Sequence, residues 1–122
     1  MNDTEQSGHE DRFRADPRTN EELISAALLL NPDEDSYWDL VWTLHRRDTV
    51  ELLNRARELG QSPVSAERRL GADILGQLGS PDRKFPTQCL ATLLDMLKEE
   101  KNADVLQAIL IALGHLGQPE AI

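Results

Sequence analysis

The chain has 122 residues, which is enough for one modest domain, and its apolar content of 39% with 4% aromatic residues favours an aliphatic core. Its formal net charge of −9 disfavours nucleic-acid binding, because that affinity comes mostly from Lys and Arg displacing counterions. A single cysteine, Cys89, excludes a disulfide within the chain. No apolar run reaches the ~20 residues of a membrane span.

The first 19 residues are polar and acidic, with no apolar core. They do not resemble a signal peptide, and they carry too little apolar surface to offset the entropy lost on ordering. We therefore expect 1–19 to be a disordered acidic leader. With one cysteine and no apolar span, the expected location is the cytoplasm.

From residue 20 onward the pattern predicts six helices in three antiparallel pairs, at about 20–47, 48–79 and 83–117. Thr19 or Asn20 caps the first helix and Asn102 the sixth, because such side chains accept from free amides of the first turn. Asp48 is the expected cap of the third helix and Gly60 its left-handed end. Pro63 is expected to open the fourth helix in its first turn. No alternating strand pattern or hairpin dipeptide is present.

An internal repeat organises the second half of the chain. The segment Leu75-Gly76-Gln77-Leu78-Gly79-Ser80-Pro81-Asp82 returns 38 residues later as Leu113-Gly114-His115-Leu116-Gly117-Gln118-Pro119-Glu120. Overlaying the last two pairs at this offset places apolar residues on apolar residues, which is typical of a repeat architecture. Gly76 and Gly114 lie inside predicted helices, where glycine costs ~1 kcal/mol relative to alanine. We therefore expect a close approach between helices at both; the alternative is chance glycine in a leucine-rich bundle.

The segments 68–82 and 105–120, with their Leu-Gly-x-Leu-Gly-x-Pro-acid pattern, resemble the second helix of HEAT-like repeats, in particular the bacterial kind also found in phycobilisome lyases. The resemblance covers roughly 48–122 and extends more loosely to the first pair, which lacks the glycines. It implies an α-α superhelix of about three helix pairs whose second helices line a concave surface. It also implies binding of partners more often than catalysis, although a fold does not establish a function.

On that surface the positions outside the core are expected to form a ladder that contacts a protein or peptide partner. Trp and Arg are common among the residues that dominate binding energy, and the predicted ladder contains both. The alternative is that both tryptophans pack against the first helix or the leader. The predicted partner-binding residues are Trp38, Trp42, Arg46, Arg69, Asp73, Gln77, Gln107, Ile111 and His115.

No catalytic, cofactor or metal site is predicted. The three histidines have no metal-binding spacing, Cys89 is expected to be buried, and the glycines do not form a phosphate loop. The run Lys98-Glu99-Glu100-Lys101 is interpreted as a solvated turn. The first functional hypothesis is a non-catalytic scaffold for another protein, and the alternative is an accessory component of a lyase-like, chromophore-handling enzyme.

The sixth predicted helix is apolar nearly all round, whereas a terminal repeat normally has a polar outer face. Residues 119–122 are read as the start of a further repeat. Two interpretations remain open: the chain is the front of a longer array, or its open end pairs with another copy or a partner. For the chain expressed alone we expect self-association through the C-terminal pair.

Overall fold

The computed structural model describes residues 16–117, which contain six α-helices and no strand. The predicted all-α class is confirmed. Residues 1–15 of the predicted leader, and the predicted start of a further repeat at 119–122, lie outside the described residues. The helices are α2 (Asn20–Leu28), α3 (Asp35–His45), α4 (Val50–Gly60), α5 (Ser65–Gln77), α6 (Pro86–Glu99) and α7 (Ala103–His115).

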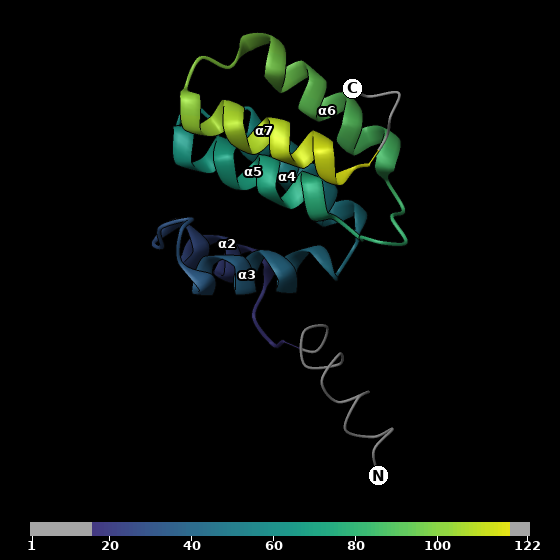
Figure 1. The fold of residues 1–122 in the computed structure, drawn as a ribbon. Coiled ribbons are helices and arrows are strands. Elements are labelled where there is room, and N and C mark those ends of the chain that lie inside the picture. Colours follow the sequence, from purple (N-terminus) through teal and green to yellow (C-terminus); the bar gives the residue numbers. More distant parts are fainter. Residues whose placement is uncertain (1–15, 118–122) are drawn as a thin grey trace.

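Helix α5 lies at the centre of the molecule. It packs most extensively against α7 and α4, and it also contacts α2, α3 and α6. The second helices of the three pairs therefore follow one another as α3, α5 and α7, while the first helices α4 and α6 also touch. Figure 1 shows α2 and α3 as a layer of their own beside the group formed by α4 to α7.

Two of the predicted caps are present. The hydroxyl of Thr19 accepts from the amide of Glu22, whose carboxylate accepts from the Thr19 amide, a reciprocal capping box. The side chain of Asn102 accepts from the amides of Asp104 and Val105 at the start of α7. These are local interactions, so the local pattern was sufficient to find them.

Three other boundary predictions were wrong. The cap of α4 is Thr49, which accepts from the Leu52 amide, whereas Asp48 is buried with a φ of 43°. Gly60 is the last residue of α4, and an added Cβ there would lie 2.8 Å from the sulfur of Met96. Pro63 precedes α5 instead of opening it, and no side chain caps that helix. In each case the helix boundary depends on a packing contact or on the loop geometry, which the local sequence pattern does not show.

Candidate protein-binding surfaces

The two predicted tryptophans on α3 have different environments. Trp38 is half-buried against the core, its indole Nε1 donates to the carbonyl of Pro32 at 2.9 Å, and its ring meets that of Tyr37 edge-on. Trp42 is 45% exposed and packs edge-on against His45, with ring centroids 4.7 Å apart. Trp38 therefore holds the loop between α2 and α3, while Trp42 is available at the surface.

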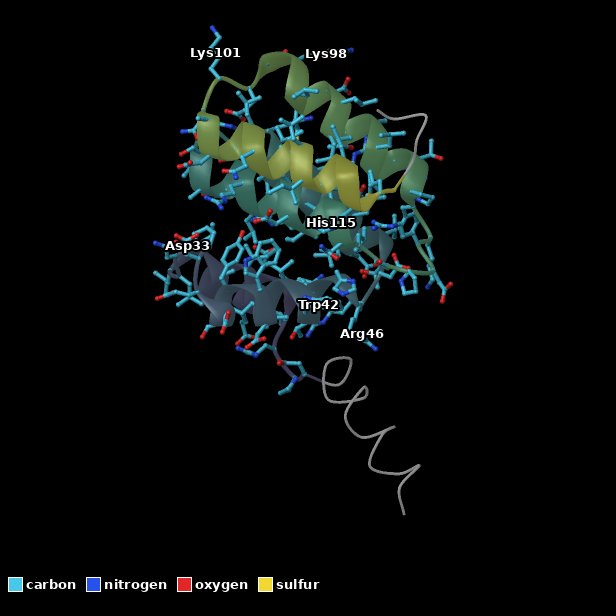
Figure 2. The ribbon with its side chains drawn as sticks, viewed as in Figure 1. Asp33, Trp42, Arg46, Lys98, Lys101 and His115 are labelled. Carbon is cyan, nitrogen blue, oxygen red and sulfur yellow. The ribbon has the colours of Figure 1, made fainter. Side chains whose placement is uncertain are left out.

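Helix α3 ends at an exposed corner of the molecule. Figure 2 shows Trp42 and the half-buried Arg46 on this lower layer, far from Lys98 and Lys101 at the opposite edge. Next to this corner the buried side chain of His45 faces the second pair. Burial and the charge of Arg46 lower its pKa to about 4, which the backbone of Gln77 opposes only in part. His45 is thus a neutral core residue near pH 7.

The α5 members of the predicted ladder are coupled to α3. Asp73 is only 6% exposed, and the hydroxyl of Tyr37 donates to its Oδ2 at 2.5 Å. Burial raises the pKa of Asp73 to about 6, against the opposing effects of the Tyr37 hydrogen bond and the Arg69 charge. Arg69 is half-buried, and its Nε is buried without a hydrogen-bond partner among the described residues. Gln77, the third member, is also half-buried.

A cavity of about 180 Å³ lies at this seam, and helices of all three pairs contribute to it. Its apolar walls include Leu28 and Leu30 at the end of the first helix and Val105 on α7, while Tyr37 and Arg69 supply polar groups. Sequence reasoning singled out Arg69 but missed the cavity, because its walls come from segments that only the tertiary fold brings together.

Helix α7 carries three exposed residues of the predicted ladder, Gln107, Ile111 and His115. Beside Ile111, which is 48% exposed, the neighbouring Leu110 is 58% exposed. Leu94 on α6 is 38% exposed. We refer to Leu94, Leu110, Ile111 and Gly114 as the open face.

The open face corresponds, at the 38-residue offset, to a buried surface of the second pair. Ala72 is fully buried where Leu110 is exposed, and Ala56 is fully buried where Leu94 is exposed. In the second pair these positions lie in helices α4 and α5, and helices α6 and α7 of the third pair pack against them. No described helix covers the matching positions of the third pair.

The two repeat glycines show the same contrast. A Cβ added to Gly76 would lie 2.6 Å from the Cβ of Ala112, so the predicted close approach is confirmed there. At Gly114 an added Cβ would meet no described atom within 4 Å, so the same prediction was wrong at that position. No helix of the described residues lies beside Gly114 on that side.

The turn between α6 and α7 also differs from its prediction. The carboxylate of Glu100 is almost fully buried and accepts two hydrogen bonds from the guanidinium of Arg68, at 2.7 and 2.9 Å. Arg68 also donates to the carbonyl of Ser62. This bidentate pair joins the second and third helix pairs, so the segment 98–101 is not simply a solvated turn.

Two larger hollows, of about 860 and 740 Å³, lie at the helix turns and are lined by charged residues of both signs. Cys89 is buried as expected, and burial raises the pKa of its thiol to about 11, which keeps it protonated near pH 7. Within 16–117 there is no group of three or more potential metal-binding side chains. None of the helices in that range is long and apolar enough to cross a membrane.

Comparison with known proteins adds no assignment to these surfaces. The chain matches no protein-family model, and no curated protein or solved structure is significantly similar to it.

Proposed function

We propose that the chain is a non-catalytic protein-binding scaffold built as a HEAT-like stack of helix pairs. The observation that carries the proposal is the open face, where apolar residues are exposed although their counterparts 38 residues earlier are buried. Exposed apolar patches, when large, mark sites of protein association, and Leu94, Leu110 and Ile111 contribute exposed apolar surface on α6 and α7. The order α3, α5, α7 of the contacting second helices also supports a superhelical stack.

One partner surface in this proposal is the face formed by the second helices. Trp42 is exposed there on α3, and Gln107 and His115 are exposed on α7. Asp73 and Trp38 stabilise this face from inside the fold, because each forms a hydrogen bond within the chain. We expect a protein or peptide partner to bind along this face, with Arg46, Arg69 and Gln77 at its half-buried positions.

The second partner surface is the open face itself, which we propose is covered by a second copy of the chain. Placing the open faces of two copies against each other would bury Leu110 and Ile111 of both chains. The chain's first pair is a poor partner for it, because the outer positions Glu21, Glu22 and Ser25 of α2 are polar and exposed. An isologous contact between two open faces closes after one dimer.

The alternative of a chromophore-handling accessory protein has no comparable observation behind it. Covalent attachment through Cys89 is disfavoured, because this thiol is 1% exposed and has a raised pKa. Absorbance of the purified chain between 350 and 700 nm, roughly the range of tetrapyrroles, would reveal a bound chromophore.

The scaffold proposal is tested by retention of partners on the immobilised chain. We expect the wild type to retain specific proteins that a Trp42→Ala, Arg46→Ala variant loses, since exposed Trp and Arg are the residue types that most often dominate binding energy. The control is Arg57→Ala, which removes an exposed arginine on α4, outside the proposed face. Equal retention by both variants would contradict binding through this face.

A further inference from the structure

The cavity at the seam of the three helix pairs has walls of opposite character. Leu28, Leu30 and Val105 contribute apolar walls, and Arg69 contributes a cationic residue to the lining. Its volume of about 180 Å³ slightly exceeds the ~150 Å³ of an engineered cavity that binds benzene. It therefore has room for one apolar side chain together with a small polar group.

Arg69 lacks the acceptors that a half-buried guanidinium normally has. Its Nε is buried without a hydrogen-bond partner, and no ion pair joins it to a carboxylate of the described chain. The nearby Asp73 acts on it through its charge, while its Oδ2 accepts the hydrogen bond of Tyr37. A carboxylate in the cavity would supply the paired acceptors that the planar guanidinium fits best.

The start of α5 reinforces this preference for an anion. Ser65 and Ala66 line the cavity, and no side chain caps the helix there. The first amides of a helix have no acceptor within it, and they point toward its N-terminus. Among the residues that line the cavity, only the exposed Asp104 carries a negative charge that would repel an anion.

We propose that this cavity binds the C-terminal residue of a partner polypeptide, with its apolar side chain between the apolar walls and its free carboxylate on Arg69. The inference rests on the proposed function, because it assigns a ligand to the face of the second helices. An internal Asp or Glu fits less well, since its carboxylate ends the side chain and leaves the apolar walls uncovered. A C-terminal leucine, in contrast, carries both groups on one Cα.

Asp73 makes this binding dependent on pH. The groups that face it are Tyr37 on α3 and Arg69 on its own helix, while Asp104 of α7 lies across the cavity. Ionised Asp73 competes with a ligand carboxylate for the charge of Arg69. Because the pKa of Asp73 is about 6, its protonation removes this competition as the pH falls from about 7.5 to about 5.5. Affinity should rise several-fold over that interval, and the rise should be absent in Asp73→Asn.

The experiment is a titration of the full chain with N-acetylated Gly-Gly-Leu as the free acid and as the C-terminal amide, followed by amide chemical shifts. We expect the free acid to shift Ser65 and Val105 and to bind at least ~10-fold more tightly than the amide, as loss of a charged bidentate contact predicts. Arg69→Gln should lose this difference, Arg69→Lys should keep part of it, and Arg57→Gln, a change outside the cavity, should leave it intact.

Equal binding of the acid and the amide would overturn the inference, and so would a free-acid affinity unchanged in folded Arg69→Gln. No shift at millimolar free acid would also overturn it. These outcomes are separable from failure of the scaffold proposal, because association through the open face does not involve Arg69 and is measured without peptide.

Discussion

The second and third helix pairs share a repeated sequence, but they differ in what surrounds them. The second pair lies between neighbours, so Ala72 and Gly76 are buried against other helices. In the third pair Leu110 is 58% exposed, and an added Cβ at Gly114 would meet no described atom within 4 Å. The comparison teaches that equivalent repeat positions are buried where a neighbouring helix packs on them and exposed where no described helix does.

A first contrast between the pairs concerns leucines 38 residues apart. Leu52 is fully buried on α4, whereas Leu90 on α6 is half-buried. Leu52→Ala should lower the free energy of unfolding by ~3 kcal/mol, and Leu90→Ala by roughly half as much, because a cavity at an open site is filled by water. Urea denaturation measures both; equal losses would contradict the difference in burial.

The two glycines should respond with opposite signs. Gly76→Ala forces a Cβ against the backbone of Ala112, at 2.7 Å from its Cα, and should destabilise the fold by ~2 kcal/mol. Gly114→Ala adds a methyl group to open space in a helix and should stabilise by up to ~1 kcal/mol. Thermal melts of both variants, analysed under conditions where the chain is monomeric, test the contrast. Destabilisation by Gly114→Ala would show that α7 is covered.

A third contrast separates Asp73 from its exposed repeat equivalent, Ile111. The folded pKa of Asp73 is raised from 3.8 to about 6, so the folded state binds this proton more tightly than the unfolded state. Asp73 therefore contributes stability that is fully present below about pH 4 and is lost as the pH rises through about 6. Its loss should amount to ~3 kcal/mol, since each pKa unit corresponds to ~1.4 kcal/mol.

The pH profile of Asp73→Asn tests this contribution. His45, with a pKa lowered to about 4, acts in the opposite direction: its stability is present above pH 6.5 and is lost toward pH 4. In Asp73→Asn the histidine contribution should dominate above about pH 4.5, where Glu100 is mostly ionised in both states, so the unfolding free energy should increase steadily up to about pH 6.5. A variant whose profile runs parallel to that of the wild type would rule out a raised pKa at Asp73.

The smallest effect on stability is expected at the open face. Leu110→Glu and Ile111→Glu together replace side chains that are 58% and 48% exposed, and should change the unfolding free energy of the monomer by less than ~1 kcal/mol. Chemical denaturation at low protein concentration measures this. A larger loss would mean that these residues support the isolated domain.

Much of the fold was predictable because it is local. The helical period, the caps Thr19 and Asn102, and the repeat located all six helices. Asp48 was misread because its carboxylate lies against Gly79, 31 residues away in sequence, where an added Cβ would meet it. Such contacts have no local signature.

The candidate site was predictable only in part. The ladder pattern identified the exposed Trp42 and Ile111, yet it also included Asp73, which is buried. The bond from Tyr37 to Asp73 depends on how the first pair sits against α5, and that pair lacks the repeat glycines that would indicate its packing. The cavity beside Arg69 depends on the same packing.

The central claim is that the third pair carries an uncovered stacking surface, and sedimentation equilibrium from low to high micromolar concentration tests it most directly. The account predicts a reversible dimer for the wild type, and a monomer for the Leu110→Glu, Ile111→Glu variant. Val50→Glu, a change at an exposed apolar residue at the start of α4, should leave the dimer intact. A wild type that stays monomeric throughout, or a dimer that survives both charges on α7, would contradict it.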